Sequence, residues 1–253
     1  MLLEPVWTAP PGMAAAMSLR AGGVSAGPYA SLNLGVAVGD DPAAVAENRA
    51  RFVRAIGARP VWLRQVHGTR VLHLERQTSE HPAQPADAAW TSEAGIACTV
   101  QVADCLPVLY ALRDGSAVAA AHAGWRGLAG GVLEATLQAL CAGTGAAPGD
   151  VQAWLGPCIG PRQFEVGADV LVACDSGPAQ AETGRFVFRP RADGTPRWLA
   201  NRALLARDRL EAAGVQPARI SEAQACTVED ASNFFSFRRD GLTGRHAAAI
   251  WRF

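Results

Sequence analysis

The apolar run at residues 97–112, "ACTVQVADCLPVLYAL", decides the fold. Its Val and Leu residues are typical of a buried strand, yet a carboxylate and a thiol, Asp104 and Cys105, stand side by side within it. The turn-like "RDGS" follows, and the next strand-like segment, "SAVAAAHAGW" at 116–125, contains His122. We therefore predict that the strand carrying Cys105 pairs with the strand that leads to His122.

Short strand-like and helix-like segments fill much of the rest of the chain. The strand-like segments are rich in Val and aromatic residues and are bounded by Gly, Pro or Asp; they lie at 60–68, 69–74, 150–156, 185–190 and 246–253. The helix-like segments lie at 41–57, 127–143 and 198–214, and "RPRADGTPR" indicates a hairpin-like excursion at 189–197. Strands come in groups with helices between the groups, which predicts an α+β fold with mixed sheets. The length fits a single domain, 1–253.

The composition is that of an ordinary globular protein. Apolar residues make up 49% and charged residues 18% of the chain, and the formal net charge is zero. This balance argues against nucleic acid or an anionic membrane as the main partner. All 23 basic residues are Arg, which excludes a Schiff-base lysine and the lysine of a phosphate-binding loop.

Cysteine usage and the N-terminal sequence indicate a cytoplasmic protein. Six Cys residues are scattered along a chain that needs no disulfides to fold. The opening "MLLEPVWTAPPGM" lacks a basic region followed by an apolar core, so we expect no signal peptide. The apolar stretch 94–112 is interrupted by Gln101, Asp104 and Pro107, and is therefore not expected to span a membrane.

Three residues have side chains suited to a metal site or a nucleophile: His67 in "RQVHG", Cys105 in "ADCLP" and His122 in "AHAGWRG". Their spacings of 38 and 17 residues are unlike those of a structural zinc module. However, two imidazoles and a thiolate suit zinc, and three protein ligands leave the fourth position open for a water of lowered pKa. Asp104 could orient one of the ligands. The alternative is a buried Cys and two hydrogen-bonded histidines.

Two further stretches contain residues suited to binding an anion or an aromatic ring. "HAGWRGLAGG" predicts a helix that begins near Gly127, with Arg126 and free backbone N–H groups beside His122, as an anion site requires. In "FFSFRRDG", 234–241, Phe side chains could hold a purine-like ring and Arg an oxyanion.

Cys158, within "WLGPCIGP", could be a reactive thiol or part of a structural turn.

Several of these motifs occur together, in one order, in a known family. The stretches, from residue 31 to the C-terminus, are "SLNLG", "VGDDPAAVAENR", "WLRQVHG", "ADAAWT", "ADCLPVL", "HAGWRG", "GPCIGPRQFEVG" and "FFSFRRDGLTGRHAAAIW". The chain resembles the YfiH-type laccase-domain family, whose members were named polyphenol oxidases and later purine nucleoside phosphorylases. The match covers about nine-tenths of the chain, and its strength comes from the whole set of motifs.

The resemblance implies a fold, a metal and an activity. It implies a single α+β domain with layers in the order α/β/β/α, similar to the catalytic domain of cytotoxic necrotizing factor toxins. It implies that one zinc ion is bound by His67, Cys105 and His122. It also implies phosphorolysis of adenosine, inosine and methylthioadenosine, and deamination of adenosine. Some members are linked to the editing of peptidoglycan precursors.

The expected partners are therefore purine nucleosides and phosphate, bound by a monomer or a weak homodimer. Phosphate needs hydrogen-bond donors, for which the candidates are Arg49, Arg126 and Arg238. Contacts to the base or the ribose are expected from Asn33, Gln65 and Ser236.

Three alternatives remain open. A copper-dependent polyphenol oxidase would use the same His, Cys and His, but an axial Met would usually complete the site, and Met1, Met13 and Met17 all lie near the N-terminus. Five His are also too few for a multi-copper cluster, so we favour zinc over copper. A metal-free hydrolase would use Cys105 as nucleophile and His122 as base, which would fit peptidoglycan precursor editing. A zinc-stabilised binding protein is the third alternative.

Overall fold

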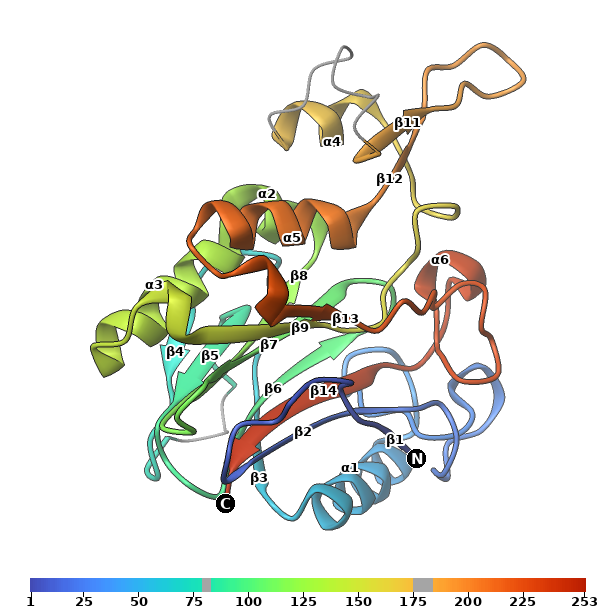
Figure 1. Cartoon of the computed structure of the whole chain (residues 1–253). Helices are drawn as coiled ribbons and strands as arrows, with labels where there is room; N and C mark the ends of the chain where they lie inside the picture. Colours follow the sequence, from blue (N-terminus) through green and yellow to red (C-terminus); the bar gives the residue numbers. More distant parts are fainter. Residues whose placement is uncertain (79–82, 175–183) are drawn as a thin grey trace.

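Two β-sheets that pack face to face form the centre of the computed structural model, which describes residues 1–78, 83–174 and 184–253 (Figure 1). The five-stranded sheet has the order β1-β2-β14-β6-β3, and the six-stranded sheet has the order β13-β9-β7-β8-β5-β4. Both sheets contain parallel and antiparallel pairs. A smaller sheet, β10-β12-β11, projects beyond them close to α4 (Figure 1). The predicted α+β fold with mixed sheets is thus confirmed.

The elements have the following bounds. The five-stranded sheet comprises β1 (Leu2–Leu3), β2 (Met13–Ser18), β3 (Arg59–Trp62), β6 (Ile96–Val102) and β14 (His246–Arg252). The six-stranded sheet comprises β4 (Val71–His73), β5 (Ala88–Thr91), β7 (Leu106–Leu112), β8 (Val118–Ala123), β9 (Val151–Leu155) and β13 (Ile220–Glu222). The smaller sheet comprises β10 (Glu165–Val166), β11 (Phe186–Phe188) and β12 (Trp198–Ala200). The α-helices are α1 (Pro42–Ile56), α2 (Trp125–Gly130), α3 (Val132–Thr144), α4 (Ala168–Ala173), α5 (Arg202–Ala212) and α6 (Phe237–Asp240).

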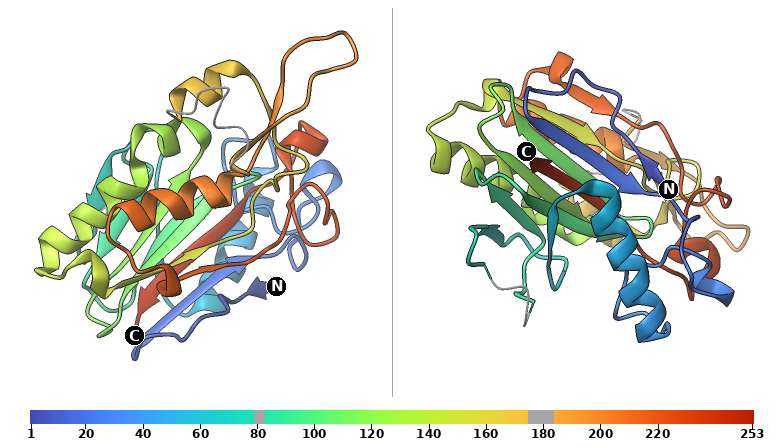
Figure 2. Two further views of the ribbon diagram at one scale, coloured as in Figure 1. Left: turned by 45° about the horizontal axis from the view of Figure 1, so that its top comes forward. Right: turned by 90° about the horizontal axis from the view of Figure 1, so that it is seen from below.

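Three apolar clusters join the layers. The outer face of the five-stranded sheet packs on α1 through a cluster that includes Phe52 and Trp251. The cluster between the two sheets includes Val100 and Leu109. The outer face of the six-stranded sheet packs on α3 and α5 through a cluster that includes Leu137. Figure 2 shows α1 on one side of the paired sheets and α3 and α5 on the other, which agrees with the expected α/β/β/α order.

The central strands are buried on both faces, which explains their unbroken apolar sequences. In β7, Leu106, Val108 and Tyr110 belong to the cluster under the helices, whereas Leu109 and Ala111 belong to the cluster between the sheets. Successive side chains of a strand point to opposite faces, so a strand covered on both sides needs apolar residues at every position. No alternation of polar and apolar residues is therefore seen in such a strand.

The run 97–112 is not one strand, as its pattern suggested, but two strands in different sheets. β6 belongs to the five-stranded sheet and β7 to the six-stranded sheet, and the link 103–105 carries the chain from one to the other. Asp104 has a φ of 88° in this link, a backbone conformation that breaks an extended strand. The predicted pairing is confirmed, because β7 and β8 are antiparallel and Pro107 lies opposite His122.

Helices form in all three segments where the sequence predicted them, but two of the three have different bounds. α1 has Asp41 as its N-cap, whose side chain accepts a hydrogen bond from Ala43 N (3.1 Å), and it ends at Gly57 with a φ of 66°. The segment 127–143 is divided into α2 and α3 at Gly131, whose φ of 95° interrupts the helix. The segment 198–214 becomes helical only after Asn201, because its first residues form β12. The predicted excursion at 189–197 joins β11 to β12 as a hairpin.

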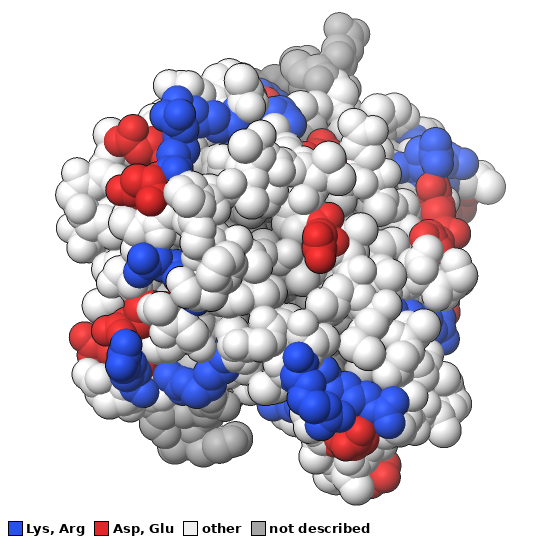
Figure 3. Space-filling model, turned by 60° about the horizontal axis from the view of Figure 1, so that its bottom comes forward, with Lys and Arg blue, Asp and Glu red and all other residues white. Residues whose placement is uncertain are grey.

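Surface features agree with the balanced composition. Across the described part of the chain, no helix has both the length and the apolar character needed to cross a bilayer. Figure 3 shows one face of the molecule, on which basic and acidic side chains lie close to one another and most of the surface is uncharged. This face therefore carries no extended field of one sign.

His246, at the start of β14, anchors the "FFSFRRDG" segment. Its Nε2 accepts a hydrogen bond from Phe235 N (2.7 Å), and its ring contacts the rings of Phe234 and Phe235, with centroid distances of 5.6 Å and 5.0 Å. Burial lowers the pKa of His246 from 6.5 to about 3. The segment is therefore held by an imidazole that stays neutral in the folded protein.

We predict that this histidine makes the protein less stable in mild acid. The pKa is lower in the folded state, so the unfolded state binds more protons, and stability falls as the pH drops from about 6.5 towards 3. At pH 5 the loss from this group is about 2 kcal/mol. Urea unfolding at pH 7.5 and pH 5, in a chelating buffer, measures it. His246→Gln, which can accept from Phe235 N but does not titrate, should lose about 2 kcal/mol less; equal losses would contradict the prediction.

Candidate metal centre

The three residues selected for their chemistry lie at one end of the two sheets. His67 is in the segment between β3 and β4, and Cys105 is in the segment between β6 and β7. Each of these segments leads from the five-stranded to the six-stranded sheet. His122 is on β8, next to β7. Two crossings between the sheets and one strand therefore supply the three side chains.

The three side chains form a group that could hold a metal ion. One ligand atom from each of His67, Cys105 and His122 lies within 4.8 Å of the others. Cys105 Sγ is 4.0 Å from His67 Nε2, and the two imidazole rings meet edge to face with their centroids 4.8 Å apart. His122 is buried, Cys105 is half-buried and His67 is exposed. The group therefore opens to the surface on the side of His67.

Asp87 is the residue that positions this group, and sequence reasoning missed it. His122 Nδ1 donates to Asp87 Oδ1 (2.8 Å), which also accepts from His67 N (2.9 Å). Asp87 Oδ2 accepts from Val66 N (3.0 Å) and Gly68 N (2.8 Å). These bonds hold His67 at a φ of 59°, which is unfavourable for a residue with a Cβ. The only signal in the sequence was an acid directly before the apolar residues of "ADAAWT".

A glycine permits the segments that carry His67, Cys105 and His122 to approach one another closely. Gly124 directly follows β8, and a Cβ at this position would lie 2.5 Å from His67 Cδ2 and 3.4 Å from Cys105 Sγ. Any other side chain here would overlap with the histidine ring. The expected helix start near Gly127 is earlier, at Trp125, and α2 is only six residues long.

The Cys105 thiol and the His122 imidazole carry opposite charges. Burial would raise the pKa of Cys105, but the positive charge on His122 and hydrogen bonds from both histidines hold it well below the ordinary value. Burial would lower the pKa of His122, but the Cys105 thiolate and Asp87 raise it to about 9. The same carboxylate has a lowered pKa: burial acts against this, but His122 and the backbone N–H groups around His67 outweigh burial. Cys105 is therefore available as a thiolate, the form that binds metals.

The donor set fits zinc. Zn–S bonds of about 2.3 Å and Zn–N bonds of about 2.0–2.1 Å that meet at a tetrahedral angle place a sulfur and a nitrogen about 3.6 Å apart. Cys105 Sγ and His67 Nε2 are 4.0 Å apart, so these side chains would move slightly closer around a bound ion. Asp87 occupies Nδ1 of His122 and so leaves Nε2 for the ion, as carboxylates commonly do for metal-binding histidines.

Asp104 does not orient a metal ligand, as we had expected, but ties the C-terminal segment to Cys105. Its Oδ1 accepts from Thr227 Oγ1 (2.6 Å), and its Oδ2 accepts from Arg238 N (2.6 Å). Ser236, the N-cap of α6, accepts from Arg239 N (3.2 Å). α6 is therefore fixed beside the metal-binding thiol.

The other predicted site residues make hydrogen bonds to protein atoms or lie on the surface. The amide of Asn33 is buried and bonded to Asp40 and to the backbone of Gly35 and Arg245. Gln65 exchanges two hydrogen bonds with the backbone of Gln101 (2.8 and 2.6 Å).

The three candidate arginines for phosphate have different surroundings. Arg49 donates to Leu34 O (3.0 Å) and lies over the ring of Trp62. Arg126 is exposed and lies over Trp125, with Cζ 4.2 Å from the ring centroid. The exposed Arg238 donates through Nη1 to the backbone carbonyls of Gln163 and Glu165. The structure thus brings the backbone of Arg238 next to Cys105, because its N–H group donates to Asp104 Oδ2 (2.6 Å).

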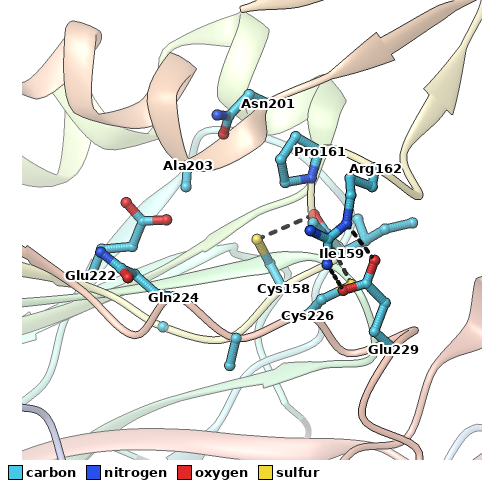
Figure 4. A pocket seen from close by; sticks show the side chains of 13 residues that line it. Cys158, Ile159, Pro161, Arg162, Asn201, Ala203, Glu222, Gln224, Cys226 and Glu229 are labelled. Carbon is cyan, nitrogen blue, oxygen red and sulfur yellow. Dashed lines mark hydrogen bonds and ion pairs between the residues drawn. The ribbon is translucent and has the colours of Figure 1, made fainter. Parts of the chain in front are cut away.

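A separate cavity of about 310 Å³ lies beside α5, and none of the three metal-binding residues lines it. Figure 4 shows Cys158, Glu222 and Asn201 around it, with the ion pair of Arg162 and Glu229 at one side (Nη2–Oε2 2.6 Å). Burial raises the pKa of Cys158 to about 12. This thiol is therefore poorly suited to act as a nucleophile.

We predict that Asp87→Asn weakens metal binding without unfolding the protein. The amide cannot accept from His122 and all three backbone N–H groups as the carboxylate does, so His67 and His122 lose their orientation. The zinc affinity, measured by competition with a chromophoric chelator, should fall by about 10–100-fold. Asp114→Asn, in the exposed turn between β7 and β8, is the matched control. An unchanged affinity in a folded Asp87→Asn variant would show that Asp87 does not position the ligands.

Comparisons with known proteins give full-length matches. A 250-residue alignment joins the chain to "Purine nucleoside phosphorylase PA4543" of Pseudomonas aeruginosa, with 46% identity over 98% of this chain and 97% of the relative. "Purine nucleoside phosphorylase YfiH" of Escherichia coli is also 46% identical, over 99% of this chain and 98% of the relative.

Solved structures show the same fold. The crystal structure of Neisseria meningitidis protein NMB0706 matches with a TM-score of 0.86 and 42% identity, over 99% of this chain and 98% of that chain. YlmD of Geobacillus stearothermophilus matches with a TM-score of 0.86 and 33% identity, over 96% and 92%. A family model described as multi-copper polyphenol oxidoreductase laccase matches residues 14–253. The chain therefore belongs to this laccase-like family, which is also the family of YfiH.

Proposed function

We propose that the protein is a zinc-dependent purine nucleoside enzyme that cleaves adenosine, inosine and methylthioadenosine with phosphate and deaminates adenosine. The observation that carries the proposal is the open group of His67, Cys105 and His122, in a chain whose full-length relatives are named purine nucleoside phosphorylases. A site with three protein ligands and an exposed side is typical of catalytic zinc, whereas structural zinc sites are closed.

The surroundings of the group support zinc over copper. The family model carries a multi-copper description, but the described residues contain one group of this kind, not a cluster of several. Met13 and Met17 belong to the apolar cluster between the sheets, and Met1 lies against Gly22. None of them is placed as the axial ligand that a blue-copper site usually has.

The chain's own residues supply the positioning that both reactions need. Asp87 fixes the tautomer of His122 and, through backbone N–H groups, the orientation of His67. Asp104 places α6, with the exposed ring of Phe237, next to Cys105. A bound zinc ion supplies a Lewis acid and lowers the pKa of a water to about 7. Cys105, whose side chain is half-buried, contributes the negative charge of the ligand set.

We propose positioning roles for Asn33, Gln65 and Ser236 rather than direct contacts with the base or ribose. Their polar groups are bonded to the loop before α1, to β6 and to α6, respectively. Arg49, Arg126 and Arg238 remain candidates for phosphate. Because Cys98, Cys105, Cys141, Cys158 and Cys226 are free thiols, we also propose a reducing compartment, the cytoplasm.

The lowered pKa of Cys105 favours one second candidate, a metal-free hydrolase. A thiolate beside a protonated His122 is the pair that a cysteine hydrolase requires. In this mechanism Cys105 would be the nucleophile. The two candidates differ in their need for metal.

The products formed from adenosine test the proposal. Purified zinc-loaded protein is incubated with adenosine, with and without phosphate, and the products are separated by chromatography. We expect adenine only when phosphate is present and inosine in both cases. A chelator should abolish both products and zinc should restore them, and Cys105→Ala should form neither.

Three other outcomes would count against the proposed function. Activity that persists in metal-free protein and is lost on alkylation of Cys105 would favour the hydrolase. Stoichiometric copper in protein purified without added metal would contradict the zinc proposal. An unchanged adenosine sample, with zinc bound, would contradict the proposed activity.

A further inference from the structure

Arg245 lies close to the candidate metal centre, although sequence reasoning did not select it. It directly precedes β14, in which His246 pairs with Val102, the last residue of β6. Arg245 is therefore joined to the end of the strand that lies opposite Val102, the residue directly before the link 103–105. This is the link that carries Cys105. Arg245 stands in the C-terminal motif "FFSFRRDGLTGRHAAAIW".

The side chain of Arg245 is held in place by uncharged groups. Its Nη1 donates to the carbonyl oxygens of Thr243 and Gly244, both at 3.0 Å. Its Cγ would be 2.7 Å from a Cβ at position 35, so Gly35 is needed for the stem to pack as it does. Cζ lies 5.7 Å from the ring centroid of Phe237, which is 57% exposed. The guanidinium is therefore oriented but not neutralised.

Two donor atoms of Arg245 remain available. Within the described ranges, no carboxylate forms an ion pair with Arg245, and its Nε and Nη2 donate to no protein atom. The side chain is nevertheless only half-exposed. A half-buried cation with two adjacent free donors is the arrangement that binds an oxyanion through two parallel hydrogen bonds.

The other arginines near the group are less well placed for this role. Arg202 is buried and donates to Asp104 O (2.8 Å), with its guanidinium over Phe164. Arg238 uses Nη1 for two carbonyls, and Arg126 projects to the surface over its neighbour. Arg245 alone among these four combines partial burial, an absent acid partner and a position beside the link to Cys105 in the described structure.

The charges around Arg245 agree with this placement. Burial lowers the pKa of Arg245, and the negative charges on Cys105 and Asp104 act against this shift. The guanidinium remains protonated, because the pKa of arginine lies far above neutral pH. The cation is thus near enough to the metal-binding thiol to interact with it.

We propose that Arg245 binds the phosphate that attacks the nucleoside, with Nε and Nη2 donating to two phosphate oxygens beside the candidate metal centre. The proposal rests on the proposed phosphorylase function. In the reaction, a third phosphate oxygen forms a bond to the anomeric carbon, while the bond from this carbon to the purine nitrogen breaks. The electron pair of the broken bond leaves with the purine, which takes up, through water, the proton that the attacking hydrogen phosphate gives up. The exposed ring of Phe237 lies beside the guanidinium.

Phosphate binding that needs no turnover is the first test. Isothermal titration of inorganic phosphate into zinc-loaded protein is compared for the wild type, Arg245→Gln, Arg245→Lys and Arg113→Gln. Arg113 is exposed in the turn at the far end of β7 and is the matched control. We expect about a 10-fold or greater loss of affinity in Arg245→Gln, a smaller loss in Arg245→Lys and none in the control. Circular dichroism and zinc content verify that each variant is folded and loaded.

Steady-state phosphorolysis of inosine is the second test. The KM for phosphate should rise by about 10-fold or more in Arg245→Gln and stay close to the wild-type value in Arg113→Gln. Equal phosphate affinity in wild type and Arg245→Gln, or no phosphate binding by the wild type, would overturn the inference. A wild type that binds phosphate through Arg245 but cleaves no nucleoside would keep the anion site and overturn the proposed function instead.

Discussion

One buried carboxylate, that of Asp87, holds together the parts of the chain that form the candidate metal centre. It accepts hydrogen bonds from the backbone of 66–68 and from the ring of His122. The backbone carbonyl of the same residue accepts from His122 N (2.7 Å). A buried charge of this kind is tolerated only when it is fully hydrogen-bonded, and here its partners are the segments that must meet. The unfavourable φ of His67 is maintained by these same bonds.

The two-sheet architecture determines which residues can meet at this place. The chain passes from the five-stranded to the six-stranded sheet after β3 and again after β6, and each passage contributes one ligand. The interiors of the central strands are filled mainly by apolar side chains on both faces, so most polar groups of the site lie where strands end. Gly124 and Asp104 adapt the backbone there, the first by its small size and the second by its positive φ. The site is thus a product of how the sheets are connected.

The sequence predicted local features well and long-range ones poorly. The caps Asp41 and Gly57 defined α1, because they act within a few residues. The passage of the chain between sheets at Asp104 was missed, because strands covered on both faces give the same apolar pattern whichever sheet they join. The metal-binding group was predicted from the chemistry of its side chains. Asp87 and Arg245 were missed, since their importance comes from neighbours that are distant along the chain.

The origin of the ligands at both sheet crossings has a consequence for biogenesis. A chain whose two sheets have not docked cannot bring His67 and Cys105 together, so the ion can be captured only after assembly is complete. An ion bound there would join the two sheet crossings, and its binding energy would add to the stability of the folded state. The supply of metal in the cell would then govern how long each copy of the protein survives.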